Sequence, residues 1–225
     1  MLKQSSAAAA TNQLLIAKHC FVVRARSLPN GFNQRPGVTL LIAEGQPLEL
    51  EIEKQSTLAA NGWLLAPEVR RRFIKTQPHT SITVEPAHPA YTRLLRWARS
   101  DSRGLQRVDA AIEYQAELSA IVDQHTFDIW VERLLAQHQQ MDPVPNPRLD
   151  YLLALVDAAA IETTAEHIWR QFRARYTASQ AHCSHWLQDS IGIPLRKLLL
   201  WRKLRRAMES LSDSSIATEV AHAAG

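Results

Sequence analysis

Cysteine is scarce in this 225-residue sequence, which contains only Cys20 and Cys183. The two cysteines lie far apart and within apolar local patterns, so a disulfide framework is not expected. The lack of such a framework favours a reducing compartment, and we expect the protein in the cytoplasm.

Long apolar runs are also missing. No segment approaches the roughly 18 apolar residues needed to cross a bilayer, so no membrane partner is expected. The first residues, MLKQSSAAAATNQ, carry one lysine but neither a leucine-rich core nor a convincing cleavage site. We therefore expect residues 1–15 to be a disordered tail.

Motifs that carry enzyme chemistry are absent as well. The sequence has no Gly-rich phosphate loop, no nucleophile elbow and no paired-carboxylate motif. One metal-like cluster is present, His182, Cys183 and His185, but on a helix Cys183 would point to the core and no second cluster completes a site. The sequence predicts no catalytic residues, no metal and no cofactor.

The composition is otherwise that of an ordinary globular protein. Hydrophobic residues make up 46% of the chain and charged residues 21%, and seven glycines are too few for a low-complexity chain. At this length the chain can form two modest domains, each with its own core.

Residues 16–90 carry strand signals. Short apolar or alternating runs are separated by turn residues such as Pro36-Gly37 and Asn61-Gly62. The runs are 21–24, 38–42, 48–52, 63–65 and 82–84. Short strands at close spacing predict a small antiparallel barrel or sandwich.

The residues that would give this first domain a chemical role are few. Its histidines are His19, His79 and His88, with no closely spaced pair, which argues against a metal-dependent enzyme. Arg70-Arg71-Arg72 is either a solvated strand end, the favoured interpretation, or a site for an acidic effector. The effector-binding residues therefore remain unassigned.

Residues 91–141 have a helical pattern. One apolar stripe contains Phe127, Trp130, Leu134 and Leu135, and a second contains Ile112, Leu118, Ile121 and Val122. The second stripe either pairs two protomers into a homodimer or packs on the chain's own strands. Three prolines within 142–147 predict a stiff linker.

The segment 170–206 is strongly basic. It holds nine Lys and Arg against one acid, Asp189, so its balance of +8 exceeds the total of +4 for the chain. The rest of the protein is therefore slightly acidic. A basic island of this kind is typical of a protein that binds a polyanion.

The segment also has the pattern of short helices. A helix should begin after Thr163 or Thr164, and a second after Ser179, ending at Gly192. On the second helix Cys183, Trp186 and Leu187 would face a core. The opposite face would then present side chains suited to DNA base edges: Ala181, Ser184, His185 and Gln188.

A longer helix should start near Pro194, with Leu195, Leu198 and Trp201 on its apolar side. Its cations would contact phosphates and position the module without reading sequence. The expected phosphate contacts are Arg196, Lys197, Arg202 and Arg206. An ordinary amphipathic helix with a solvated basic face is the alternative.

These residues resemble the AraC/XylS-type transcription regulators. Residues 179–192, followed by the run LLLWRKLRRA at 198–207, resemble the first helix-turn-helix and connecting helix of that family. Residues 146–149 resemble the segment that opens the same domain, and 219–225 the start of a second helix-turn-helix. Residues 64–69 and 84–86 resemble, more loosely, its small cupin-like sensing domain.

The sequence departs from the family pattern at three places. Arg173 stands where a small residue is usual, Thr177 stands where glycine is usual, and residues 215–219 are one residue longer than usual. The sequence ends at Gly225, within the second module, so we expect this chain alone to bind DNA weakly.

The resemblance implies an α+β protein: a cupin-like β-barrel (16–90), a helical dimerisation segment (91–141) and an all-α helix-turn-helix DNA-binding domain (148–225). The implied function is sequence-specific binding of double-stranded DNA by a homodimer under control of a small-molecule effector. The alternative is a ligand-binding or dimerising protein of the same ancestry that has lost effective DNA binding.

Overall fold

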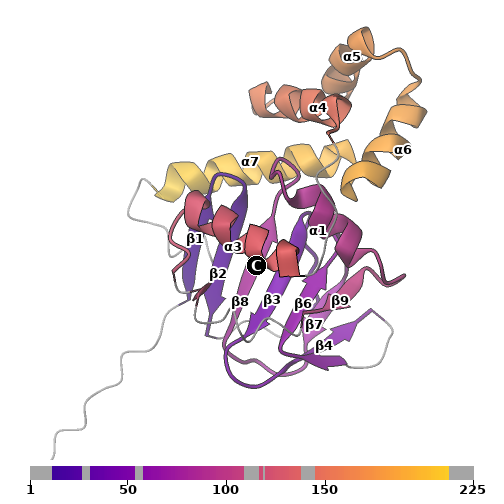
Figure 1. Cartoon of the computed structure of the whole chain (residues 1–225). Coiled ribbons are helices and arrows are strands. Elements are labelled where there is room, and N and C mark those ends of the chain that lie inside the picture. The colour runs from indigo at the N-terminus through magenta and orange to yellow at the C-terminus, as the bar shows by residue number, and fades with distance from the viewer. Residues whose placement is uncertain are drawn as a thin grey trace, which may run out of the picture.

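The structure is a computed structural model that describes residues 12–26, 31–53, 58–108, 117–118, 120–137 and 145–212 of the chain. Its N-terminal part contains two antiparallel sheets (Figure 1). The larger sheet has the order β1-β2-β8-β3-β6-β9, and the smaller has the order β5-β4-β7. The strands of the larger sheet are β1 (Gln13–Ala17), β2 (Cys20–Ala25), β3 (Val38–Ala43), β6 (Gly62–Leu65), β8 (His79–Val84) and β9 (Leu105–Arg107), and those of the smaller sheet are β4 (Leu48–Ile52), β5 (Leu58–Ala60) and β7 (Arg71–Phe73).

The two sheets pack on each other through an apolar layer, and we call this unit the β-sandwich. In β4, Leu48, Leu50 and Ile52 are buried while the intervening glutamates are half-exposed, which is the alternation of a strand with one covered face. The layer contains Leu41, Leu48, Leu50, Ile52, Trp63, Leu65, Phe73 and Leu105. The predicted strand runs in β2, β3, β4, β6 and β8 are confirmed.

Helices cover the other face of the larger sheet. They are α1 (Tyr91–Ala98) and α3 (Gln124–Gln137), which Figure 1 shows across that sheet. The predicted stripe on α3 is confirmed, because Phe127, Trp130, Leu134 and Leu135 are all buried.

The C-terminal part is helical and its helix ends are set by local sequence. The helices are α4 (Pro147–Ala158), α5 (Ala165–Arg175), α6 (Gln180–Ile191) and α7 (Leu195–Ser212). Asn146, Thr164 and Ser179 are the N-caps of α4, α5 and α6, and each side chain accepts a hydrogen bond from the backbone N–H three residues later. Figure 1 shows α7 between the β-sandwich and the group formed by α4, α5 and α6.

Gly192 joins α6 to α7 and contacts the β-sandwich. Its φ of +85° is left-handed, as is common for a glycine that ends a helix. A Cβ atom at this position would lie 3.0 Å from Cγ of Pro67, so the residue is also required by close packing. One apolar cluster runs without interruption from the larger sheet through α1 and α3 into α4–α7.

Three expected boundaries differ from the structure. Gln13–Leu15, placed in the tail 1–15, belong to β1 because they pair with β2. The segment 91–141 is not wholly helical, since Leu105–Arg107 form β9 and pair with β6. The linker 142–147 extends one residue too far, because Pro147 is already the first residue of α4.

Other expectations fall outside the described residues or are only partly met. Residues 1–11, 142–144 and 213–225 lie outside, and with them the segment that resembles a second helix-turn-helix. The two antiparallel sheets agree with the expected class of a sheet domain followed by helices. No helix of the described ranges combines the length and the apolar character needed to cross a membrane.

Gly37 offers a direct test of the close packing of β3 against β8 within the larger sheet. A Cβ atom there would lie 2.4 Å from the carbonyl oxygen of Val84, whereas one at Gly31 would meet nothing within 4 Å. We expect Gly37→Ala to lower the free energy of unfolding by about 2 kcal/mol or more, because the contact is with backbone. Gly31→Ala should change it by less than about 0.5 kcal/mol, and equal urea midpoints for the two variants would contradict the packing.

Candidate nucleic-acid interface and its contact with the sheets

Helices α5 and α6 are joined by the four residues 176–179 and share an aromatic core. The rings of Phe172 and Trp186 stack with centroids 5.6 Å apart, and the guanidinium of Arg148 lies 4.2 Å from the Trp186 ring centroid. Of the three residues predicted to face a core, Cys183 and Leu187 are buried and Trp186 is half-buried, and Ile191 is buried as well. This packing fixes which side of α6 faces solvent.

The solvent side of α6 carries the four residues expected to meet base edges. Ala181, His185 and Gln188 are exposed and Ser184 is half-buried. The first turn of α6 contains no acidic residue, so its N-terminal end is free of side chains that would repel a phosphate backbone. The geometry therefore leaves a face of small and hydrogen-bonding groups open to a ligand.

The two substitutions within the first module are accommodated locally. Arg173 is half-buried and its Nε donates a hydrogen bond to the carbonyl oxygen of Trp169, 3.3 Å away on the same helix. Thr177 is exposed and does not have a positive φ, so this connection does not need a glycine. Both helices keep their caps despite these residues.

The cluster His182, Cys183 and His185 is split by the helix. The two histidines are exposed, and Cys183 is fully buried on the other side. Within the described part of the chain, no three His, Cys, Asp or Glu side chains are placed to hold a metal ion.

Three of the four expected phosphate contacts already have partners within the protein, although Lys197 itself is exposed. Lys197 pairs with Glu68, and Arg202 pairs with both Glu85 and Asp157. Arg206 donates to the carbonyl oxygens of Ala159 and Asp157, at 2.5 and 2.6 Å. Arg196 is exposed, and no hydrogen bond or ion pair of its side chain is seen within the described residues. The expected open row of cations is thus reduced to Arg196 in this conformation.

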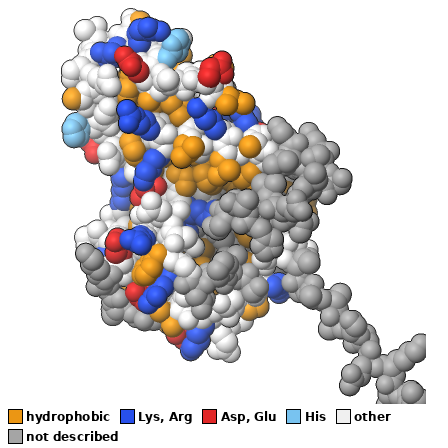
Figure 2. All heavy atoms as spheres, turned by 180° about the vertical axis from the view of Figure 1, so that it is seen from behind, with side chains coloured by type: hydrophobic (Ala, Val, Ile, Leu, Met, Phe, Trp, Pro, Cys, Tyr) orange, Lys and Arg blue, Asp and Glu red, His pale blue; other side chains and the backbone are white. Residues whose placement is uncertain are grey.

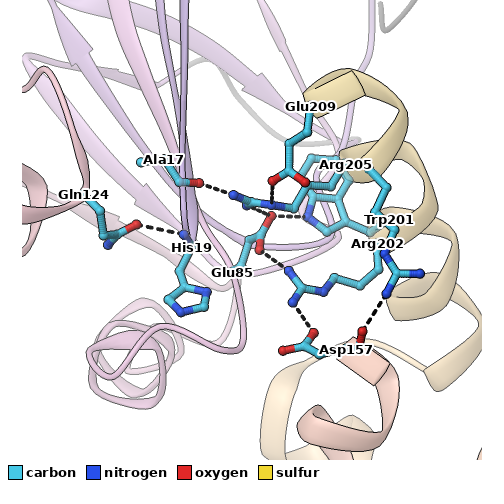
Figure 3. Close-up of polar contacts among 10 residues, drawn as sticks. Ala17, His19, Glu85, Gln124, Asp157, Trp201, Arg202, Arg205 and Glu209 are labelled. Carbon is cyan, nitrogen blue, oxygen red and sulfur yellow. Dashed lines mark hydrogen bonds and ion pairs between the residues drawn. The ribbon is translucent and has the colours of Figure 1, made fainter. Parts of the chain in front are cut away.

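Arg202 is one of three side chains bound by Glu85, which follows β8 and is 1% exposed (Figure 3). Its Oε1 accepts hydrogen bonds from Trp201 Nε1 at 2.9 Å and from Arg205 at 2.6 Å, while its Oε2 accepts one from Arg202 at 3.0 Å. All three donors belong to α7. We call Glu85, Trp201, Arg202 and Arg205 the Glu85 cluster.

Neighbouring groups complete the surroundings of Arg205. Its Nε pairs with Glu209 at 2.8 Å, and a terminal nitrogen donates to the carbonyl oxygen of Ala17. The Phe21 ring lies 5.1 Å from the Trp201 ring and 5.0 Å from the Arg205 guanidinium. A buried arginine with this set of acceptors and an aromatic face is well compensated.

Two titratable groups next to this cluster, His19 and Cys20, are neutral at physiological pH. Burial, and then the nearby cations of Lys18, Arg202 and Arg205, lower the pKa of His19 to about 4. Burial, with a smaller contribution from Glu85, raises the pKa of the Cys20 thiol to about 12. Neither group therefore changes the charge of the cluster between pH 6 and 8.

The C-terminal end of α6 is anchored to α1. The buried Tyr91 hydroxyl donates to the carbonyl oxygen of Ile191 at 2.5 Å. Arg99 donates to the carbonyl oxygen of Asp189 at 2.8 Å, where a cation is favoured by the helix dipole. These contacts hold the C-terminal end of α6 against α1.

Basic side chains do not form one uninterrupted surface. Figure 2 shows Lys and Arg interspersed with Asp and Glu over the upper, helical part of the face it presents. Sequence reasoning did not identify Glu85, Arg99 or Arg205 as functional residues. Their partners lie 90 to 120 residues away in the chain, and no local pattern signals such pairs.

The residues expected to pair two protomers divide into two groups. Leu118 and Ile121 are buried within the chain's own core, at 3% and 2% exposure. Val122 is 63% exposed, and Ile112 lies outside the described residues. Leu118 and Ile121 thus follow the alternative in which this stripe packs on its own strands.

The Glu85 cluster generates a stability prediction. In Glu85→Gln the guanidiniums of Arg202 and Arg205 lose a buried counter-charge, so we expect unfolding to cost about 3–5 kcal/mol less in urea titrations. The matched control is Glu49→Gln, which breaks a solvent-exposed pair with Lys75 and should cost less than about 1 kcal/mol. Similar losses for the two variants would show that the cluster does not hold α7 in place.

Comparisons with known proteins give little further information. No protein-family model matches the chain, and no curated protein matches it in sequence. Among solved structures, a Ralstonia eutropha JMP134 protein with the provisional name mannose-6-phosphate isomerase is 12% identical, over 37% of this chain and 93% of that chain, with a TM-score of 0.29. A likeness at this level carries no argument about this protein.

Proposed function

We propose that this chain is a DNA-binding transcription regulator of the AraC/XylS type, in which α5 and α6 act as a helix-turn-helix and α6 enters the major groove. The observation that carries the proposal is the open face of α6, where Ala181, His185 and Gln188 are exposed opposite a buried face. A face that were merely solvated would usually carry Glu and Lys.

Exposed cations on the two helices next to α6 along the chain support the proposal. Arg170 and Arg175 lie on α5, and Arg196 lies at the start of α7. Cations in these places would contact phosphates and orient α6 without reading sequence. In the proposed regulator the β-sandwich corresponds to a cupin-like sensing domain, and two copies together bind two half-sites, which raises the affinity of weak single modules.

The Glu85 cluster fits a regulated protein. Arg202 cannot meet a phosphate while it pairs with Glu85 and Asp157, so the conformation described here offers fewer phosphate contacts than the sequence contains. An effector that favours release of α7 from the β-sandwich would shift the population toward a form that binds DNA more tightly.

The retention of Lys197, Arg202 and Arg206 also favours a second function. A protein whose cations permanently serve its own fold would bind a ligand in the β-sandwich and would not read DNA. The two functions differ in one measurable property, which is the salt dependence of DNA binding.

Fluorescence anisotropy with duplex DNA tests the proposal. We expect binding of random-sequence duplex that weakens with salt, and Arg196→Ala should reduce the slope of log K against log salt by about 1. Arg70→Ala, which removes an exposed arginine of the β-sandwich, is the matched control and should leave the slope unchanged.

Sequence reading is tested separately on duplexes enriched from a random pool. His185→Ala should reduce the preference for enriched over random duplex by about 1–3 kcal/mol, since one base contact is lost. His125→Ala, at an exposed position of α3, should not change that preference. If neither the wild type nor Glu85→Gln shows salt-dependent binding, the second function replaces the first.

A further inference from the structure

The three consecutive arginines of β7 and its N-terminal flank have different environments. Arg70 pairs with Glu53 at 3.3 Å and Arg72 pairs with Glu51 at 2.5 Å, both at the surface. Arg71 is 3% exposed. It alternates with Arg72, shares its strand face with Phe73, and lies opposite Ile52 of β4. Since Phe73 and Ile52 belong to the apolar layer, the side chain of Arg71 lies between the two sheets.

Arg71 has no counter-charge there. Among the described residues no carboxylate forms an ion pair with it, and its Nε has no hydrogen-bond partner. One side-chain hydrogen bond is seen, a long one of 3.4 Å from a terminal nitrogen to the carbonyl oxygen of Val69. Burial, and then the nearby Arg35, lower the pKa of Arg71 to about 9. An unpaired buried cation of this kind is costly, and it is rare unless a ligand completes it.

Two buried acceptors near Arg71 also lack partners. Asn33 forms a β-bridge directly opposite Arg71, with backbone hydrogen bonds of 2.8 and 3.0 Å, so both side chains lie on the same side. Its buried Oδ1 accepts no hydrogen bond. His79 is 1% exposed and its ring lies 4.5 Å from that of Phe73. Its Nδ1 is 2.9 Å from the carbonyl oxygen of Gln77, which makes Nδ1 the protonated nitrogen and leaves Nε2 a buried acceptor without a partner.

The inward face of β8 continues this polar surface. His79, Ser81 and Thr83 alternate along β8, and Thr39 of β3 lies opposite Thr83. All four are at most 7% exposed. Polar side chains in series are unexpected on a strand face that looks into an otherwise apolar layer, because each one costs free energy to bury.

We propose that the unpaired polar groups of Arg71, Asn33 and His79 together form a binding site for a small carboxylate that carries two hydroxyl groups. The carboxylate would accept hydrogen bonds from the guanidinium of Arg71, which presents donors in a fork that matches it. The hydroxyl groups would donate to His79 Nε2 and Asn33 Oδ1. One such molecule satisfies an unpaired cation and two unpaired acceptors, which neither a simple carboxylate nor a neutral polyol does.

The assignment of this molecule as the effector rests on the proposed function, whereas its binding does not. The exposed arginines on either side of Arg71 provide matched controls, because Arg70 and Arg72 differ from it in pairing and burial. Binding is therefore measured without DNA, and DNA affinity is measured separately.

Thermal unfolding of the whole chain at constant ionic strength tests the site. Glycerate, a carboxylate with two hydroxyl groups, should raise the Tm of the wild type by roughly 5–10 °C at a hundredfold excess over Kd, whereas propionate and glycerol should raise it much less. Arg71→Met should abolish the shift and raise the Tm of the free protein by a few degrees, because it removes an uncompensated charge. Arg70→Gln should keep the wild-type response.

Several outcomes would overturn the proposal. These are no shift of the wild type by glycerate, an equal shift by propionate, a shift by inorganic phosphate alone, or a shift that survives in Arg71→Met. If the ligand-free Arg71→Met protein is less stable than the wild type, Arg71 has a structural role.

If Arg71→Met does not fold, Arg71→Lys is measured instead. Its affinity for the ligand should be at least tenfold lower, because a lysine lacks the forked pair of donors of a guanidinium. None of these measurements involves DNA, and DNA binding by the ligand-free protein is measured in a separate experiment. Either proposal can therefore fail without the other.

Discussion

The position of the C-terminal helices depends on one buried carboxylate. Glu85 is almost inaccessible to solvent, and a buried charge is tolerated only where counter-charges and hydrogen bonds surround it. Three side chains of α7 supply them, so α7 must lie against the end of β8 for Glu85 to be accommodated. The requirement is mutual, since Arg205 is buried too and takes its acceptors from the β-sandwich and from Glu209. Apolar contacts of Phe21 with Trp201 then fill the remaining surface.

This contact changes what the basic segment can do. A row of cations on an isolated helix would be available to phosphates, but here Arg202 and Lys197 are already paired with acids from the N-terminal half. To contact Arg202, a duplex would have to replace its buried ion pair with Glu85, which costs several kcal/mol when only one partner leaves. The pair of Lys197 with Glu68 lies at the surface and costs much less. The free face of α6 and the exposed Arg196 carry no such cost. In the proposed regulator, DNA binding in the described conformation would depend on α6, and a phosphate contact by Arg202 would require that α7 first separate from Glu85.

The parts that the sequence could predict are those encoded by neighbouring residues. Ser179, Thr164 and Gly192 mark helix ends through bonds to residues three or four positions away, and the structure has these ends at the same places. The short strands β1 and β9 were missed because each is defined by pairing with a distant strand rather than by its own pattern. The burial of Arg71 was missed for a similar reason. Three arginines in a row resemble a solvated strand end, and only the register of β7 against β4 turns the middle one inward. The position of Arg71 two residues before Phe73, and therefore on the same strand face, was the one local signal.

The side chains of Arg71, between the two sheets, and of Arg205, in the Glu85 cluster, are both buried but have different surroundings. Both guanidiniums are inaccessible, so both bear the cost of leaving water. Arg205 is surrounded by acceptors, including two carboxylates, whereas no carboxylate of the described chain reaches Arg71. A fold selected for stability alone would treat the two alike. β8 also connects these regions, because His79 begins the strand and Glu85 follows its last residue. A ligand held by Arg71 and His79 would thus bind at one end of the strand whose other end holds α7, and any displacement of β8 along its length would act directly on Glu85.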